Sequence, residues 1–148
     1  MKIYKPVSGI MTTKVITVTP SAPLTQLRRI FKENSFHHIP VCVRGRLVGI
    51  ISKTDFLHVT HGVSLHGNVA EANEEIYRKI KARDIMTRGI AKISPNDHIA
   101  VAMELFLENL FHCIPIVEDG DKKLKGIVTT FDIIKYGMES EERMSIAS

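Results

Sequence analysis

Hydrophobic and polar positions follow the same order twice along the chain. A short apolar stretch at residues 15–18, and another at 90–93, ends at Thr-Pro or Ser-Pro and predicts an extended segment. After each stretch, apolar residues recur at the spacing of one helical face. They are Leu24, Leu27 and Phe31 in the first copy, and Ile99, Met103, Phe106 and Leu110 in the second. The pattern therefore predicts a strand followed by an amphipathic helix in each half.

Matching polar residues mark the ends of both predicted helices. Ser21 and Asn96 precede the apolar stripe and are candidate N-caps, because their side chains can accept hydrogen bonds from free backbone N–H groups. Asn34 and Asn109 follow the stripe, where asparagine can adopt the left-handed conformation that closes a helix. These positions predict similar boundaries for the two helices.

Two strands joined by a tight turn follow each predicted helix, and a further helix comes next. The strands are residues 39–43 and 47–52 around Arg44-Gly45-Arg46, and residues 114–117 and 124–129 around Asp119-Gly120. The second helices begin near Thr54 and Phe131. Each half is thus a β-α-β-β-α unit, which predicts a mixed α/β (α+β) fold.

Sequence identity between the halves shows that the order of elements is an internal repeat. Residues 33–40 align with residues 108–115 and are identical at six of the eight positions. Residues 49–55 align with 126–132, where Gly-Ile-Ile-Ser-x-x-Asp matches Gly-Ile-Val-Thr-x-x-Asp. The chain is therefore expected to contain two copies of one structural unit.

We place the two units at residues 7–61 and 82–138. The remaining segments are a linker at 62–81, made of a loop at 62–68 and a helix at 69–80, and a polar tail at 139–148 that is expected to fray. A three-stranded sheet with helices on one side leaves an apolar face exposed. We therefore expect the two units to pack together.

Composition places the chain among ordinary globular proteins. Of 148 residues, 44% are hydrophobic and 24% are charged, which disfavours fibrous, disulfide-stapled and disordered classes. No apolar stretch reaches the roughly 18 residues of a membrane span, and the first residues lack the apolar core of a secretory signal. Two cysteines fit a reducing compartment. We expect a cytoplasmic protein without a membrane partner.

The formal charge of +4 is concentrated in the first half. Residues 1–61 contain nine Lys/Arg and two Asp/Glu, whereas residues 62–148 contain eleven and fourteen. A basic stripe on the first helix, Arg28, Arg29 and Lys32, could meet an acidic partner or nucleic acid. No nucleic-acid-binding motif accompanies the stripe, so nucleic acid is not the expected partner.

The closing motif of each repeat puts a hydroxyl at a strand end and a carboxylate three residues later, at the start of a helix. The pairs are Ser52 with Asp55 and Thr129 with Asp132. A carboxylate can accept hydrogen bonds from both hydroxyls of a ribose, and helix-start N–H groups suit a phosphate. The same spacing is also a capping box that only closes the helix end. From the residues alone, both interpretations stay open.

Together these motifs resemble a tandem pair of cystathionine β-synthase (CBS) domains, the Bateman module. Ile-Met-Thr opens each repeat, Phe-His-x-Ile-Pro enters each hairpin, and the closing motif ends it. The resemblance implies two units packed with pseudo-twofold symmetry, whose clefts bind AMP, ADP, ATP or S-adenosylmethionine as a regulatory ligand. It also implies a homodimer, with no required cofactor and no catalytic role, that signals to a separate effector protein.

The resemblance also implies which residues line the ligand clefts, and it favours ribose binding by the closing motifs. Residues after Met-Thr and before the hairpin proline would surround the adenine: Thr12, Val15, His37 and His38 in the first unit, and Thr87, Ile90, His112 and Cys113 in the second. Leu27, Phe31, Phe56 and Ile133 would lie on the helices through which the family forms dimers.

Charge near the closing motifs predicts a difference between the two sites. Lys53 follows Ser52, and Arg44, Arg46 and His38 are close in sequence, whereas the second unit has an acidic turn at Glu118-Asp119. Several cations favour a polyphosphate. We therefore expect the first site to prefer ATP or ADP over AMP.

Two other functional classes remain as alternatives. A nucleic-acid-binding regulator would use the basic first half. A small metal-dependent enzyme would use His58, His61 and His66, although no cysteine or carboxylate stands at ligand spacing beside them. We expect neither a metal site nor an enzyme.

Overall fold

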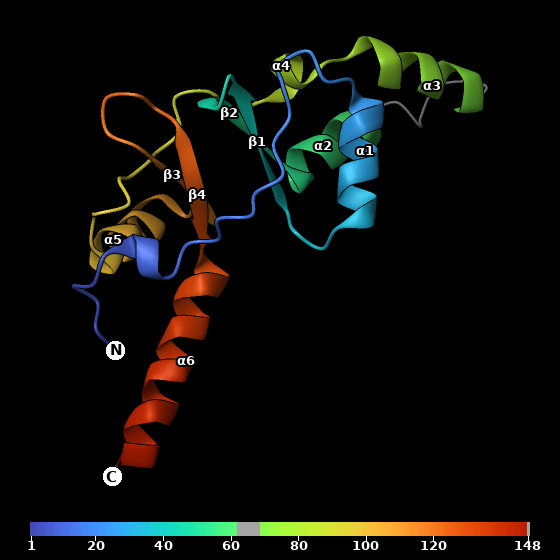
Figure 1. Ribbon diagram of the computed structural model, residues 1–148. Helices are drawn as coiled ribbons and strands as arrows, with labels where there is room; N and C mark the ends of the chain where they lie inside the picture. The colour runs from blue at the N-terminus through green and yellow to red at the C-terminus, as the bar shows by residue number, and fades with distance from the viewer. Residues whose placement is uncertain (62–68, 148) are drawn as a thin grey trace. The chain divides into compact units, whose positions relative to one another are not determined.

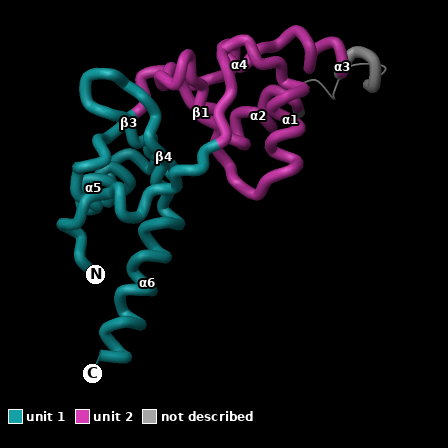
Figure 2. Tube along the Cα trace, in the orientation of Figure 1, with its two compact units in different colours: residues 1–15, 91–148 teal, residues 16–90 magenta. Residues whose placement is uncertain are grey.

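The structure, a computed structural model, describes residues 1–61 and 69–147, with side chains described for 1–60 and 74–147 (Figure 1). The predicted loop at 62–68 lies outside the described residues. The chain forms two compact units, and Figure 2 colours them separately. Unit 1 contains residues 1–15 and 91–148, and unit 2 contains residues 16–90. Unit 2 is therefore continuous in sequence, whereas unit 1 combines both ends of the chain.

Unit 2 is an antiparallel hairpin with helices. Its elements are α1 (Leu24–Glu33), β1 (His38–Val43), β2 (Arg46–Ser52), α2 (Lys53–His61), α3 (Val69–Lys79) and α4 (Ala82–Ile85). The predicted opening strand is reduced to one parallel bridge between Val18 and Val41. A second bridge joins Ile50 to Thr87.

Unit 1 repeats this design with the other hairpin. Its elements are the short 3-10 helix η1 (Val7–Gly9), α5 (Ile99–Asn109), β3 (Cys113–Val117), β4 (Leu124–Thr129) and α6 (Thr130–Ala147). Parallel bridging again involves one pair, Ile93 with Ile116, and Thr12 bridges to Ile127. The predicted mixed α/β class and the two hairpin-and-helix repeats are confirmed.

The opening Met-Thr segment of each repeat lies on the hairpin of the other repeat. The N–H of Thr12 donates to the carbonyl of Ile127 at 2.8 Å, and the reverse bond is 3.0 Å. In unit 2, Thr87 and Ile50 exchange bonds of 2.9 and 3.1 Å. Each compact unit therefore joins one hairpin to the opening segment of the other repeat.

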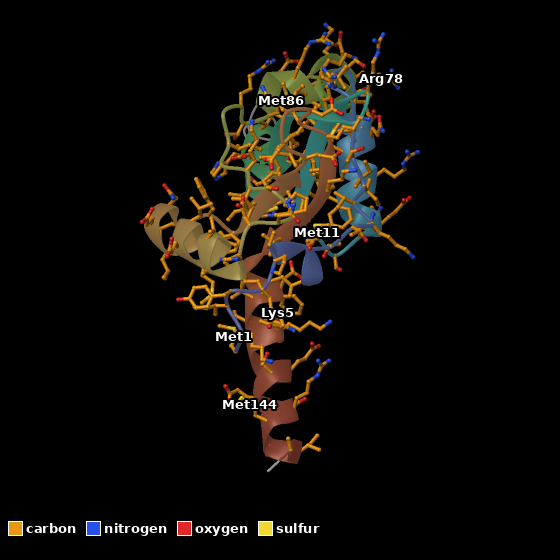
Figure 3. The ribbon with its side chains drawn as sticks, turned by 60° about the vertical axis from the view of Figure 1, so that its left-hand side comes forward. Met1, Lys5, Met11, Arg78, Met86 and Met144 are labelled. Carbon is orange, nitrogen blue, oxygen red and sulfur yellow. The ribbon has the colours of Figure 1, made fainter. Side chains whose placement is uncertain are left out.

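Two glycines make this crossing sterically possible. A Cβ at Gly126 would lie 2.6 Å from the carbonyl oxygen of Thr12, and a Cβ at Gly49 would lie 2.7 Å from Met86 Sδ. Met11 and Met86 are labelled in Figure 3. The glycine that opens each closing motif is thus required by close backbone approach.

The core of unit 2 lies between the hairpin and its helices. Leu24, Leu27, Ile39 and Ile51 are fully buried. Phe56 packs between Phe31 and Tyr77 of α3, with ring centroids at 5.4 and 6.3 Å. The helix predicted at 69–80 is observed as α3, and it covers part of α1.

The N-terminal segment completes the core of unit 1. Val7 is fully buried in one cluster with Ile114, Ile116 and Val128. The N–H of Val7 donates to the carbonyl of Asp97 at 2.7 Å, and the N–H of Ile99 donates to that of Lys5 at 2.9 Å. These bonds fix residues 5–7 against the start of α5.

The predicted helix caps were wrong in detail. The residues at the N-cap positions are Pro23 and His98, and neither makes a side-chain cap bond. Ser21 and Asn96 lie in the preceding turns. Asn34 is extended and Asn109 is still helical, yet each amide donates to the carbonyl four residues earlier, at 2.8 and 3.1 Å. The asparagines close the helices through their side chains because terminal carbonyls lack backbone partners.

In the tail expected at 139–148, the described residues 139–147 continue α6 instead of fraying. The helix extends to Ala147, and Ser140 Oγ donates to the carbonyl of Tyr136 at 2.7 Å. The segment is rich in glutamate, a good helix former, and it contains no proline to end the helix. Among the described residues, no helix is both long and apolar enough to cross a membrane.

Candidate functional site

In each unit, the closing motif meets the Phe-His step at one end of the hairpin. His38 pairs with Ser52, and Cys113 pairs with Thr129. The N–H of Lys53 donates to the backbone carbonyl of His37 at 2.7 Å, and the N–H of Thr130 donates to the backbone carbonyl of His112 at 3.3 Å. Strand pairing therefore brings together the histidine step, the hydroxyl and the start of the next helix.

The Asp132 carboxylate makes a full capping box in unit 1. Asp132 Oδ2 accepts the Thr129 N–H at 2.7 Å and the Thr129 hydroxyl at 2.8 Å. The Asp132 N–H points back to Thr129 Oγ1 at 3.3 Å. One carboxylate oxygen is thus engaged at the helix start, while Oδ1 is left for a ligand.

The Asp55 motif makes only half of that box. Its N–H donates to Ser52 Oγ at 3.0 Å. Within the described part of the chain, the Asp55 carboxylate makes no hydrogen bond or ion pair. Both of its oxygens are therefore available to a hydroxyl or an N–H donor.

A pocket of about 440 Å³ in unit 1 contains Asp132, and we call it the Asp132 pocket. It lies between the N-terminal segment and α6. Its lining residues are Lys5, Pro6, Gly9, Ile10, Thr12, Ile99, Asp132, Lys135, Tyr136, Glu139 and Arg143. Figure 3 shows Lys5 on the N-terminal segment beside the first half of α6. The volume is in the range of small-molecule sites.

Several of these residues were not predicted from the sequence. Lys135, Tyr136, Glu139 and Arg143 follow Asp132 at helical spacing and so share one face of α6. That spacing was visible in the sequence, but fraying was expected from residue 139. Lys5 carried no sequence signal, because its approach to Asp132 depends on the crossing of the N-terminal segment.

The family assignment follows from comparison with known sequences. The CBS domain model matches residues 7–62 and 82–139. The chain belongs to the CBS domain family. Together, the two matches make it a tandem CBS pair, as the repeat predicted.

Relatives and solved structures show the same fold. An uncharacterized protein of Methanocaldococcus jannaschii, MJ1426, is 31% identical and matches 82% of this chain and 85% of its own length. The structure of MJ1225 from the same organism has a TM-score of 0.78 and 30% identity, covering 92% of this chain and 49% of that one. CBSX2 in complex with AMP has a TM-score of 0.76 and 23% identity, covering 93% and 98%. The chain spans about half the length of MJ1225 and MJ1404, two of its curated relatives.

The crossing groups the predicted ligand residues of this CBS pair differently from the repeats. Unit 1 holds Thr12, Val15, His112, Cys113, Thr129 and Asp132, and unit 2 holds His37, His38, Ser52, Lys53, Asp55, Thr87 and Ile90. Of these, Thr12 and Asp132 line the Asp132 pocket together. The first repeat therefore supplies Thr12 to the hairpin of the second.

The hairpin arginines lie away from the closing motif. Arg44 is in the turn and Arg46 pairs with Val43, while Ser52 pairs with His38 at the opposite end of the hairpin. At about 3.3 Å per residue, Ser52 lies roughly 20 Å from Arg46 along β2. The prediction that these arginines are cations of the closing-motif site was wrong, because an extended strand separates residues that are close in sequence. The acidic turn at Glu118 and Asp119 is remote from Thr129 for the same reason.

The cysteines of the CBS pair are free thiols with suppressed reactivity. Burial raises the pKa of Cys113 to about 12, and the negative charge of Asp132 adds to the rise. Burial also raises the pKa of Cys42. Both groups are therefore protonated near neutral pH.

The described side chains form no cluster of three or more His, Cys, Asp or Glu able to hold a metal ion. Of the three histidines weighed as ligands, His58 is exposed, and the side chains of His61 and His66 lie outside the described residues.

Proposed function

We propose that this CBS pair is a regulatory module that binds an adenosine-containing ligand and signals to a separate partner protein. The observation that carries the proposal is the presence of Asp132 and Thr12 in one pocket of suitable volume. The structure of CBSX2 holds AMP, and that of MJ0100 holds 5′-methylthioadenosine and S-adenosylmethionine. AMP, ADP, ATP and S-adenosylmethionine are thus the candidate ligands.

The ribose contact is assigned to the closing motifs. Asp132 Oδ1 and both oxygens of Asp55 are free to accept ribose hydroxyls. Ser52, Lys53 and Thr129 would lie beside the sugar or phosphate, and the adenine would be lined by the remaining predicted residues: Thr12, Val15, His112 and Cys113 in unit 1, and His37, His38, Thr87 and Ile90 in unit 2. A hydroxyl-to-carboxylate bond is charge-assisted and selects for a ribose.

A homodimer is part of the proposal, with a changed interface. Of the four residues expected at the dimer contact, Leu27, Phe31 and Phe56 are buried inside unit 2 and Ile133 packs against the core of unit 1. We therefore place the proposed contact on exposed residues instead. On α6, by contrast, Phe131, Ile134 and Met138 are 70%, 61% and 64% exposed at positions that share one helical face. Leu107 of α5, which packs against α6, and the α5 C-cap residue Leu110 are also exposed, and we call these five residues the α5–α6 face.

Signalling would be a population shift without chemistry. A ligand that binds one arrangement of the module more tightly than another favours that arrangement, and the partner protein recognises it. The module would act in the cytoplasm, where Cys42 and Cys113 stay reduced.

Ligand carry-over and thermal shift together test the proposal. Mass spectrometry of the gently purified protein should detect an adenosine compound, and added ligand should raise the melting temperature. Asp132→Asn should weaken binding by roughly tenfold or more, because the charged acceptor is lost. Asp97→Asn is the matched control, since Asp97 also caps a backbone N–H, that of Ser94, but does not line the pocket. Failure of every adenosine compound to bind would refute the proposal.

A further inference from the structure

Three cations from two distant parts of the chain line the Asp132 pocket. Lys5 comes from the N-terminal segment, and Lys135 and Arg143 come from α6. Within the described residues, neither Lys5 nor Arg143 has a carboxylate partner. Lys135 Nζ lies 4.0 Å from Glu139 Oε1, the outer limit of an ion pair. Lys5 and Arg143 are therefore the pocket cations without an ion-pair partner among the described residues.

The two acidic groups of the pocket do not cancel this charge. Asp132 uses Oδ2 in the capping box, and Glu139 faces Lys135. Three positive charges stand against two negative charges, so the lining keeps a net charge of +1. A ligand entering the pocket meets a net positive wall.

The order of these groups along α6 matches an extended anion. From Asp132, Lys135 is about 4.5 Å along the helix axis and Arg143 about 16 Å, given a rise of 1.5 Å per residue. The long Arg143 side chain can bring its guanidinium closer to Asp132 than this axial distance. A ligand whose ribose is held by Asp132 would thus carry its phosphates past Lys135 toward Arg143, with Lys5 on the opposite wall.

Two of the three cation positions are not repeated among the described side chains of unit 2. By repeat alignment, the position of Lys5 is occupied by Ile80, which packs against the core, and that of Lys135 by His58. Lys53 is its one cation within the closing motif. Lys5 and Lys135 therefore have no Lys or Arg equivalent at these two aligned positions of unit 2.

We propose that the Asp132 pocket selects a nucleoside di- or triphosphate, with the polyphosphate held by Lys5, Lys135 and Arg143. This inference rests on the proposed function and names the ligand class of the unit 1 site. ATP and ADP bind there more tightly than AMP, because each added phosphate brings negative charge to the cationic wall. S-adenosylmethionine, which carries a sulfonium cation, binds more weakly than the nucleotides.

Calorimetric titration of ATP, AMP and S-adenosylmethionine into the full chain tests the inference. Lys5→Ala and Arg143→Ala should each reduce the preference for ATP over AMP by roughly tenfold while AMP still binds. Lys92→Ala, an exposed cation of unit 1 outside the pocket, is the matched control and should leave the preference unchanged. Ligand-free melting curves check that the variants are folded.

The outcomes separate the two proposals. If AMP and ATP bind but the ATP-over-AMP ratio is the same in wild type, Lys5→Ala and Arg143→Ala, the inference is overturned and the adenosine-binding function stands. Asp55→Asn must also leave this ratio intact, because Asp55 belongs to the other unit; loss of selectivity in that variant would move the polyphosphate site to unit 2. Absence of binding by any adenosine ligand would remove the proposed function itself.

Discussion

The two units share one repeat pattern but expose different surfaces. In unit 2, α3 covers part of α1, Tyr77 packs on Phe56, and Arg28 lies 4.3 Å above the Tyr77 ring. In unit 1, no equivalent helix among the described residues covers α5 and α6, and Phe131 and Ile134 are exposed. The two repeats thus share the hairpin and the closing motif. The segments outside the repeats, such as α3, determine which helical face is exposed.

The closing motifs differ in the same way. Asp132 is engaged by Thr129 and lies in a pocket with cations, whereas the Asp55 carboxylate has no bond within the described chain. Identical spacing therefore gives a full capping box in unit 1, whereas in unit 2 the carboxylate makes no bond to a described residue.

The largest expected effect concerns the crossing of the opening segments. Gly126→Ala places a Cβ 2.6 Å from the Thr12 carbonyl oxygen, which is backbone held by two hydrogen bonds. Gly49→Ala meets Met86 Sδ first, at 2.7 Å, and that side chain can move, with the Thr87 carbonyl at 3.1 Å. Chemical denaturation should show a loss of about 2–4 kcal/mol for Gly126→Ala and a smaller loss for Gly49→Ala. Equal losses would show that the two crossings are equally rigid.

The next effect is on assembly. Ile134→Ser and Met138→Ser each remove apolar area from the α5–α6 face without opening a core, since both side chains are more than half exposed. Light scattering should show a shift from dimer to monomer at micromolar concentration. Leu57→Ser is the matched control, because Leu57 is the repeat equivalent of Ile134 on α2 and is 39% exposed. A dimer that resists the Ile134 and Met138 changes but dissociates with Leu57→Ser would place the interface on unit 2.

The fold was predictable wherever local pattern decides the outcome. Short continuous apolar runs on either side of a Gly-containing turn specify the hairpins. The i, i+3, i+7 stripe of Leu24, Leu27 and Phe31 specifies α1. The opening strands were overestimated, since residues 15–18 make one bridge only. A short apolar stretch does not reveal how many of its backbone groups will find a strand partner.

Two residues of the Asp132 pocket, Thr12 and Asp132, were among the predicted ligand residues, but the grouping of the pocket was not predictable. The closing motifs identified Asp55 and Asp132 because hydroxyl and carboxylate are adjacent in sequence. Lys5 lines the same pocket as Asp132 only because the N-terminal segment lies on the second hairpin, a long-range contact that no local pattern contains. Arg46 shows the opposite case, since it is near Ser52 in sequence and at the far end of the strand in space.

A moderate effect on stability is expected to distinguish Asp132, which caps a helix, from Asp55. Asp132→Asn weakens the acceptor for the Thr129 N–H and hydroxyl, so the ligand-free protein should lose about 1 kcal/mol of stability. Asp55→Asn should lose little, because its carboxylate caps nothing in the described structure. Melting temperatures without ligand measure this difference. A larger loss for Asp55→Asn would contradict the observed asymmetry.

The smallest effect tests how firmly α3 covers unit 2. Arg28 Nη2 bonds Glu74 Oε1 at 3.1 Å while its guanidinium stacks on Tyr77. Both members of the ion pair are more than 40% exposed, so solvent screens the Coulomb attraction and most of the contribution should come from the stacked ring. We expect Arg28→Ala to cost about 0.5 kcal/mol and Glu74→Gln less than half of that.

Arg29→Ala is the matched control, since Arg29 is the exposed neighbour on α1. A double-mutant cycle with Tyr77→Leu isolates the cation–π part, because leucine keeps apolar bulk and removes the ring. Coupling of Arg28 to Tyr77 that exceeds its coupling to Glu74 would show that α3 is held by packing and stays in place at high salt. If Arg28 couples more strongly to Glu74 than to Tyr77, the contact between α3 and α1 is mainly electrostatic and should weaken as the salt concentration rises. Unit 2 would then expose the helical face that α3 covers.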